Sequence, residues 1–204
     1  MNLKLHRHLK ALPALALLFC MLPALTVSAQ PESIRRSSVP IRSVRSTSTL
    51  RNYTADKACD LDTSTAWFES AKDTGAGEGL TFSVSSSRIT AMGILPGYVK
   101  NETVYTENCT IKRVLIHSGR VWKSVDVSAF VPDFANPQPL IISFPTPIPV
   151  EDGKVTVSIL EAVPGTRSSH TGISEVFFLT DERPEEETYA AAAGTPADLL
   201  PAPP

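Results

Sequence analysis

The sequence has no excess of positive charge. Its 19 lysine and arginine residues are outnumbered by 21 aspartate and glutamate residues, which gives a formal net charge of −2 at pH 7. A domain that binds nucleic acid needs a basic surface that neutralises the phosphates. This charge balance therefore argues against a nucleic-acid partner.

The sequence also lacks an apolar run that could cross a membrane, which needs about 20 residues. The main apolar stretch, residues 11–27, is interrupted by Pro13 and Pro23; basic residues precede it, and small residues up to Ala29 follow it. This order predicts a secretory signal peptide over residues 1–29 rather than a membrane anchor. We therefore expect a secreted, periplasmic or cell-envelope protein with no transmembrane anchor in the mature chain. Its charge would be 16 − 21 = −5, because the signal holds three basic residues and no acidic ones.

Cysteine is scarce, with three residues in the whole chain. Cys20 lies in the predicted signal peptide, which leaves Cys59 and Cys109. An even pair in an exported chain favours a disulfide, and closing a loop of this length would contribute about 4 kcal/mol on the chain-entropy model. The alternative is two buried free thiols, because sequence alone does not place the two sulfurs together.

No window of helical length shows a convincing 3.6-residue period. Apolar residues instead recur in short segments, rich in β-branched and aromatic residues and bounded by turn formers. These segments predict strands at residues 80–84, 89–95, 111–117, 121–127, 140–144, 154–159 and 173–179. Many short strands separated by turns indicate an all-β sandwich.

The segments on either side of these strands have few large apolar residues. Residues 30–52 are rich in Ser, Thr and Arg, which predicts an exposed linker. Residues 181–204 are acidic, then Ala-rich, then Pro-rich, which predicts a disordered tail. The folded unit is therefore expected to be one domain over residues 53–180.

Recognisable catalytic motifs are missing. The sequence has no Gly-x-Ser-x-Gly elbow and no pair of histidines at zinc spacing. The glycine-rich stretch at 74–79 lacks the Lys-Ser or Lys-Thr of a phosphate loop. Asp60 and Asp62 are too close in sequence to act as the separated carboxylates of a glycosidase. We therefore do not expect an enzyme.

The stretch CDLDTSTAWFES, residues 59–70, carries two carboxylates and three hydroxyls just before a tryptophan. Asp60, Asp62 and Thr65 could supply the hard oxygen ligands that calcium prefers. Their side chains could instead bond the backbone in an Asx or Ser/Thr turn. On these residues alone, the turn is favoured over the calcium site. Trp67 is expected to be an anchor in the core.

Several stretches, taken in order, resemble the discoidin-like, galactose-binding-like domains. DLDTSTAWFES is similar to their Asp-Gly-x-x-x-Thr-x-Trp signature, and GAGEGLTF, ITAMGILPGYVKN, CTIKRVLIH and HTGISEVFF follow it. GYVKN and ISEVFF are most similar to the branch called the NADase-type glycan-binding domain. The resemblance implies a galactose-binding-like β-sandwich, or jelly roll, that binds glycans through loops at one end and is not a catalyst.

The resemblance also implies a structural calcium ion under those loops, held by the early Asp loop and by a Glu near the last strand. The corresponding residues of this sequence are Asp60, Asp62, Thr65 and Glu175. Leu61 stands where the family pattern has Gly, and a leucine disfavours a turn that needs a positive φ.

A sugar site needs an aromatic face for the C–H side of the ring and fixed polar groups for the hydroxyls. We expect the loop after Leu95 and the turn at 167–170 to form it, with the residues Tyr98, Lys100, Asn101, Tyr105, Arg167 and His170. The tyrosines could instead pack at strand ends, and Lys100 and Asn101 could simply be solvated. The alternative function is a structural or protein–protein interaction sandwich of the cell envelope without sugar binding.

Overall fold

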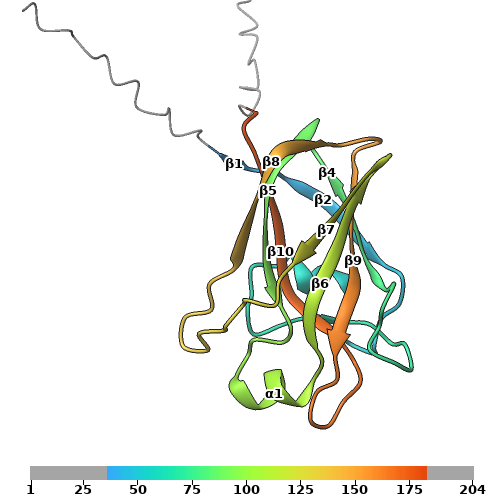
Figure 1. The fold of residues 1–204 in the computed structure, drawn as a ribbon, viewed down its shortest axis with the longest axis vertical. Coiled ribbons are helices and arrows are strands. Elements are labelled where there is room, and N and C mark those ends of the chain that lie inside the picture. The colour runs from blue at the N-terminus through green and yellow to red at the C-terminus, as the bar shows by residue number, and fades with distance from the viewer. Residues whose placement is uncertain (1–35, 183–204) are drawn as a thin grey trace, which may run out of the picture. The chain divides into compact units, whose positions relative to one another are not determined.

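The computed structural model describes residues 36–182, which form two antiparallel sheets packed face to face (Figure 1). Sheet A contains, in spatial order, β1 (Ser37–Ser38), β10 (Gly172–Thr180), β5 (Arg88–Pro96) and β8 (Leu140–Pro149), and β3 (Trp67–Phe68) pairs with β10. Sheet B contains, in spatial order, β2 (Ile41–Ser46), β4 (Gly79–Val84), β9 (Lys154–Val163), β6 (Thr110–Ser118) and β7 (Val121–Asp126). The expected all-β sandwich is confirmed.

The seven strands predicted from the apolar pattern are all present, as β4 to β10. Two of them run further than predicted, because β8 continues to Pro149 and β9 to Val163. The structure adds the 3-10 helix η1 (Ala55–Ala58) and the helix α1 (Glu102–Glu107). Neither is long enough to produce a helical period in the sequence.

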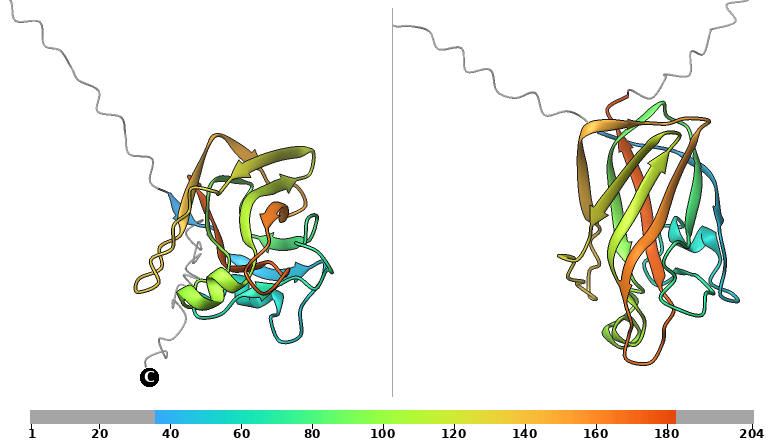
Figure 2. Two further views of the ribbon diagram at one scale, coloured as in Figure 1. Left: turned by 60° about the horizontal axis from the view of Figure 1, so that its bottom comes forward. Right: turned by 45° about the vertical axis from the view of Figure 1, so that its right-hand side comes forward.

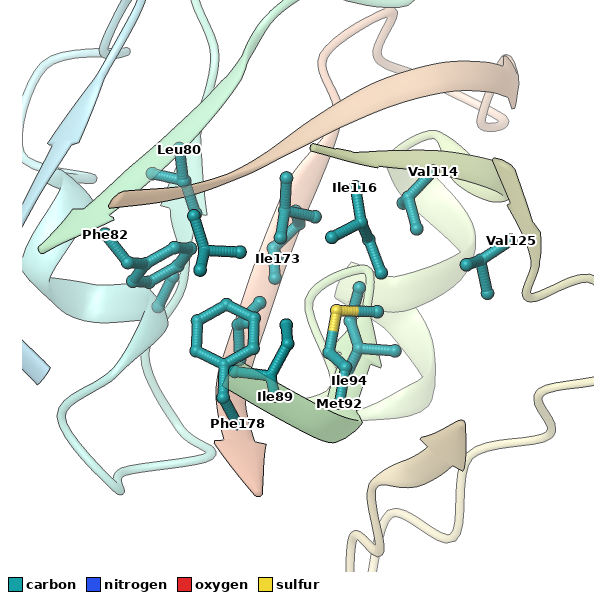
Figure 3. Packing of buried hydrophobic residues seen from close by; sticks show 14 of the residues in the cluster. Leu80, Phe82, Ile89, Met92, Ile94, Val114, Ile116, Val125, Ile173 and Phe178 are labelled. Atoms are coloured by element: carbon teal, nitrogen blue, oxygen red, sulfur yellow. The ribbon is translucent and has the colours of Figure 1, made fainter. Parts of the chain in front are cut away.

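The core lies between the two sheets and follows from the alternation within the strands. In β4, Leu80 and Phe82 are fully buried while Thr81 between them is partly exposed. The Phe82 ring meets the Phe178 ring of sheet A edge to face, with centroids 5.3 Å apart (Figure 3). Each fully buried side chain of this size stabilises the fold by about 1.5–3 kcal/mol, so this interlocking layer dominates the stability of the domain.

The prediction that residues 30–52 form an exposed linker is wrong for the part that the structure describes. β1 pairs with β10, and β2 pairs with β4 at the edge of sheet B. Val39 is 3 % exposed, and Ile41 and Val44 pack against the core. The Ser and Arg residues between them face solvent. Because only three residues of this segment are apolar and packed on the core, its sequence resembles that of a polar linker. Residues 30–35 lie outside the described range.

The other end of the domain is also longer than predicted. The Arg88 Nε donates to the Asp181 carboxylate across 2.7 Å, and the Glu182 carboxylate accepts from the backbone N–H of Ser87. Asp181 and Glu182 therefore belong to the folded domain rather than to the predicted tail. Residues 183–204, like the predicted signal peptide at 1–29, lie outside the described residues. No helix within residues 36–182 is long and apolar enough to cross a membrane.

The predicted Cys59–Cys109 disulfide is wrong, because both residues are free thiols. Cys59 ends η1 and is half-buried against the core. Cys109 is buried between α1 and β6, where its thiol lies 3.8 Å from the Ser168 carbonyl oxygen. The fold thus gives each sulfur its own packing site. Burial, followed by the charges of Glu175, Asp60 and Asp56, raises the pKa of the Cys59 thiol to about 11, which keeps it protonated and slows its reactions.

We predict that the domain needs β1 and β2. A chain that begins at residue 53 loses Val39, Ile41 and Val44 from the core and uncovers the edge of β4. Its free energy of unfolding should fall by at least about 3 kcal/mol, a large part of the 5–15 kcal/mol typical of a domain. Urea unfolding of this chain and of one that begins at residue 34 measures the difference. Equal midpoints in the two chains would contradict the packing of β2.

We also predict that residues 34–182 carry two free thiols. Alkylation under denaturing, non-reducing conditions should add two groups to the intact mass, because Cys59 and Cys109 are unpaired. Under native conditions Cys109 should react far more slowly than Cys59, since it is buried. A chain that gains alkyl groups only after reduction would show that the bridge does form.

Candidate functional site

Among the connections at one end of the sandwich, the lower end in Figure 1 and the right-hand view of Figure 2, four lie around the predicted site residues. They are residues 47–66 before β3, 69–78 before β4, 97–109 with α1, and 164–171 before β10. The last two bond directly to each other: the backbone N–H groups of Arg167 and Ser168 both donate to the Glu107 carbonyl oxygen. The Cys109 N–H donates to the His170 carbonyl oxygen at the other end of the same contact.

Tyr98 links the loop after β5 to the Asp loop, which is residues 59–66. Its hydroxyl donates to the Ser64 carbonyl oxygen at 2.9 Å. Its ring meets the rings of Phe68 and Tyr53 edge to face, with centroids 5.6 and 6.1 Å away. Burial, followed by Tyr53 and the charge of Asp62, raises the pKa of the Tyr98 hydroxyl. The ring is half-buried, so Tyr98 both holds two loops together and offers part of its surface to solvent.

The next three predicted residues have different surroundings. Lys100 is exposed. The Asn101 side-chain oxygen accepts from the Val104 N–H and caps α1, which commits that oxygen to the helix. The Tyr105 ring packs over Gly97, where a Cβ would lie 2.6 Å from the ring, and burial raises the pKa of its hydroxyl. Tyr105 is therefore mainly a packing residue, as the alternative interpretation held for the tyrosines.

Arg167 and His170 lie on the turn before β10, beside α1. The Arg167 guanidinium pairs with the Glu107 carboxylate at 2.9 Å and is largely exposed. The His170 Nδ1 lies 3.7 Å from the Glu69 carboxylate. Glu69 is fully buried, and its carboxylate accepts the backbone N–H groups of Thr171 and Ala71. Sequence reasoning missed Glu69; the only signal was a carboxylate directly after the buried pair Trp67-Phe68.

The Asp loop adopts the turn that the family pattern assigns to glycine. Leu61 has φ of 63°, in the left-handed region. Its side chain is 85 % exposed, and its backbone N–H donates to the Glu175 Oε2 at 3.1 Å. A leucine tolerates this strained φ because its side chain meets solvent and its N–H gains a charged acceptor. The substitution therefore leaves the loop conformation in place.

Oxygen atoms converge on the Thr65 hydroxyl. Its Oγ1 lies 3.1 and 3.0 Å from the two Asp60 carboxylate oxygens, 3.0 Å from the Asp62 carbonyl oxygen and 3.4 Å from the Lys57 carbonyl oxygen. One hydroxyl proton serves one of these four acceptors well. Asp60 has further donors, because its Oδ1 accepts from the Asp62 N–H at 3.0 Å and its Oδ2 accepts from the Lys57 ammonium at 3.3 Å. The Asp62 side chain is turned away and accepts from Ser64, so Asp62 contributes only its carbonyl oxygen.

Glu175 completes this oxygen-rich region from β10. Its Oε1 is buried and has no hydrogen-bond partner among the described residues. Burial, followed in smaller part by the charges of Asp60 and Asp62, raises the pKa of the Glu175 carboxyl to about 7, and the bond from the Leu61 N–H partly offsets this. In residues 36–182, no three His, Cys, Asp or Glu side chains group as a metal site. A cation would therefore depend on hydroxyl and carbonyl oxygens as well as carboxylates, a ligand mixture that suits calcium.

Solved structures with a similar fold are carbohydrate-binding modules. The family 32 module of NanJ from Clostridium perfringens, solved in complex with galactose, is 16 % identical with a TM-score of 0.51; the match covers 72 % of this chain and all of that one. A structure of ZmpB from the same organism, containing two family 32 modules and the M60 catalytic domain, is 13 % identical with a TM-score of 0.50. That match covers 73 % of this chain and 15 % of that one. At these identities the likeness establishes the fold.

No curated protein matches the chain. Residues 34–179 match the family described as the NAD glycohydrolase translocation F5/8 type C domain. The match spans both sheets and all four end loops, and it begins before β1, as the pairing of β1 and β2 requires. It confirms the resemblance to discoidin-like, galactose-binding-like domains that the Asp loop and the later stretches indicated. The chain belongs to the NAD glycohydrolase translocation F5/8 type C domain family.

Proposed function

We propose that this chain is an exported, non-catalytic carbohydrate-binding module that holds a glycan at the end of the sandwich formed by the four loops. The observation that carries the proposal is the joining of the loop after β5 to the turn before β10, which brings the exposed cations of both to one end of the fold. The galactose complex of the NanJ module, which shares this fold, supports the same class of ligand. Export rests on the basic, apolar and small-residue order of residues 1–29.

The side chains best placed for a sugar are Tyr98, Lys100, Arg167 and His170. The exposed part of the Tyr98 ring would stack on the C–H side of a pyranose. Arg167 and Lys100 would donate to hydroxyl or carboxylate oxygens, and His170 is fixed beside Glu69. Asn101 and Tyr105 support this site through α1, the first by capping the helix and the second by packing under it.

Calcium is proposed as a structural ion of the same end of the fold. The residues that would hold it are Asp60, Thr65 and Glu175 through their side chains, and Asp62 and Lys57 through carbonyl oxygens. A cation there would neutralise Glu175 and supply the missing partner of its Oε1, next to Asp60, which Lys57 already pairs at 3.3 Å. Because Tyr98 bonds the carbonyl of Ser64 within this loop, the ion would also steady the sugar site.

We expect Tyr98→Ala to weaken binding of a glycan identified on a broad array by about fivefold or more, because lost stacking costs about 1 kcal/mol. Arg167→Ala should weaken binding too. Arg88→Ala is the matched control: it also removes one exposed ion pair, to Asp181 at 2.7 Å, but at the opposite end of β5. Both arginine variants should lose under about 1 kcal/mol of stability. Calorimetry gives the affinities, and thermal unfolding gives the stabilities.

If Tyr98→Ala lowers the melting temperature and leaves the affinity intact, the tyrosine belongs to the packing between loops and the site lies elsewhere. If the wild-type domain binds nothing on the array, with or without calcium, the protein-interaction alternative replaces the sugar proposal.

We expect millimolar calcium to raise the melting temperature relative to excess chelator. At 100 times the dissociation constant, a ligand selective for the native state adds about 2.7 kcal/mol, or roughly 5–10 °C for a domain of this size. Asp60→Ala should abolish this response. Asp62→Ala is the control and should retain it, because the Asp62 side chain faces Ser64 rather than the oxygen cluster. An identical melting curve of the wild type in calcium and in chelator would refute the ion.

A further inference from the structure

The outer face of sheet B carries an exposed tryptophan far from the end loops in sequence. Trp122, on β7, is 61 % exposed and is the most exposed aromatic side chain of residues 36–182. It is the second residue of β7 (Val121–Asp126) and does not belong to the core cluster. A single exposed apolar side chain is ordinary on a protein surface, so what distinguishes Trp122 is how its ring is held.

Trp122 is held in a fixed orientation by its neighbour on β6. His117 and Trp122 are directly opposite in the strand register, and their rings are stacked with centroids 4.1 Å apart and planes 11° from parallel. Since β7 is the last strand of sheet B, no further strand covers the second face of the indole. The stack thus presents one preoriented aromatic plane to solvent.

The row that contains this stack continues across the whole sheet. The registers pair His117 with Thr156, Thr156 with Thr81, and Thr81 with Arg45. The two threonine hydroxyls lie 3.0 Å apart and bond to each other. Four strand spacings of about 4.8 Å make the row roughly 19 Å long, so only an extended ligand reaches from Trp122 to Arg45.

The charges of this face have one sign along the row. Arg45 and Lys154 are both exposed, and neither forms an ion pair with a residue in the described part of the chain. Lys154 precedes Thr156 by two residues, so both side chains leave β9 on the same face. Arg113 lies further along β6 and is already neutralised by Glu161 at 2.7 Å. Asp126, opposite Arg113 in the register, adds a second carboxylate at that end of the face. The row is therefore cationic, whereas the region around Arg113 is not.

We propose that this face is a second glycan site, independent of the end loops, which binds a carboxylate-bearing polysaccharide. One sugar ring stacks on the free plane of Trp122, the chain crosses the hydroxyls of Thr156 and Thr81, and its carboxylates meet Arg45 and Lys154. A protein partner fits this face less well, because the core of a protein interface is a contiguous apolar patch. Here the indole stacks on His117 and continues into a row of two threonines and Arg45.

Tryptophan fluorescence tests the contact directly. The chain has two tryptophans, and Trp67 is fully buried, so acrylamide quenching of the purified protein reports mainly Trp122. Polygalacturonate, alginate and hyaluronate serve as acidic probes, with dextran as the neutral one. At least one acidic probe should reduce the quenching constant at least twofold, and added salt should reverse the effect. Dextran should not reduce it.

Variants separate this face from the end loops. Trp122→Ala and Arg45→Ala should each weaken binding of the acidic probe at least fivefold in affinity electrophoresis. Trp122→Phe keeps an aromatic plane and should therefore retain part of the affinity. Arg113→Ala, on the same face outside the row, and Tyr98→Ala, at the end loops, should leave this binding unchanged. All of these side chains are at least partly exposed, and thermal unfolding checks that each variant folds.

Protection by dextran as strong as by the acidic probes, or no protection by any of them, would overturn the proposal. So would an Arg45→Ala variant with unchanged affinity, or loss of acidic binding in Tyr98→Ala, which would place that ligand at the end loops. If Trp122→Ala converts a sedimenting dimer into a monomer, the face is a self-association surface instead. The end-loop proposal fails if the array shows no binding or if Tyr98→Ala leaves the affinity for an array glycan unchanged. Neither result bears on the face of sheet B, so the two proposals can fail separately.

Discussion

The two-residue strand Trp67–Phe68 is the contact on which the loop end of this domain depends. Its residues pair with Ile173 and Gly172 of β10, and the Trp67 indole N–H donates to the Ser48 carbonyl oxygen. The Trp67 side chain is fully buried, which places a large apolar group and a satisfied polar group at one point. The segment after β2, the Asp loop and the last strand are thereby held together.

Phe68 extends this anchor toward the surface. Its backbone N–H donates to the Tyr53 carbonyl oxygen, and its own carbonyl accepts from the Leu50 N–H. The Phe68 ring covers Gly172, where a Cβ would lie 2.7 Å from the ring, and meets Tyr98 edge to face. The next residue, Glu69, ties the turn before β10 in two ways: its carboxylate accepts the Thr171 N–H, and its own N–H donates to the Thr171 carbonyl oxygen. The anchor therefore determines where the residues of both proposed loop sites lie.

The two proposed glycan sites use different physical properties of the same sandwich. The end loops are joined by bonds between loop backbones, such as those to the Glu107 carbonyl oxygen, and by bonds from side chains to backbone, such as that of Tyr98 to Ser64. The outer face of sheet B is held by the strand ladder itself, which keeps a row of side chains at fixed spacing without any loop. A regular strand positions its side chains rigidly, whereas the end loops rely on Trp67, Glu69 and Glu175 for the same result.

Local sequence patterns were sufficient for much of the fold. The seven strands β4 to β10, the sandwich class and the burial of Trp67 follow from two-residue alternation and turn residues, because these depend on neighbours along the chain. The order of the Asp loop and the later stretches was enough to indicate the family. The polar edge strands β1 and β2 were missed, since their pairing depends on the distant partners β10 and β4.

Only the tertiary structure decided how the individual side chains are used. It separated Cys59 and Cys109 into two packing sites, placed Leu61 at a positive φ with its side chain in water, and turned the Asp62 carboxylate away from Thr65. It also stacked His117 on Trp122 and put Glu69 under the turn before β10. Each of these outcomes joins residues from different strands or loops. The sequence by itself determined which segments become strands, and the register of those strands decided which side chains meet.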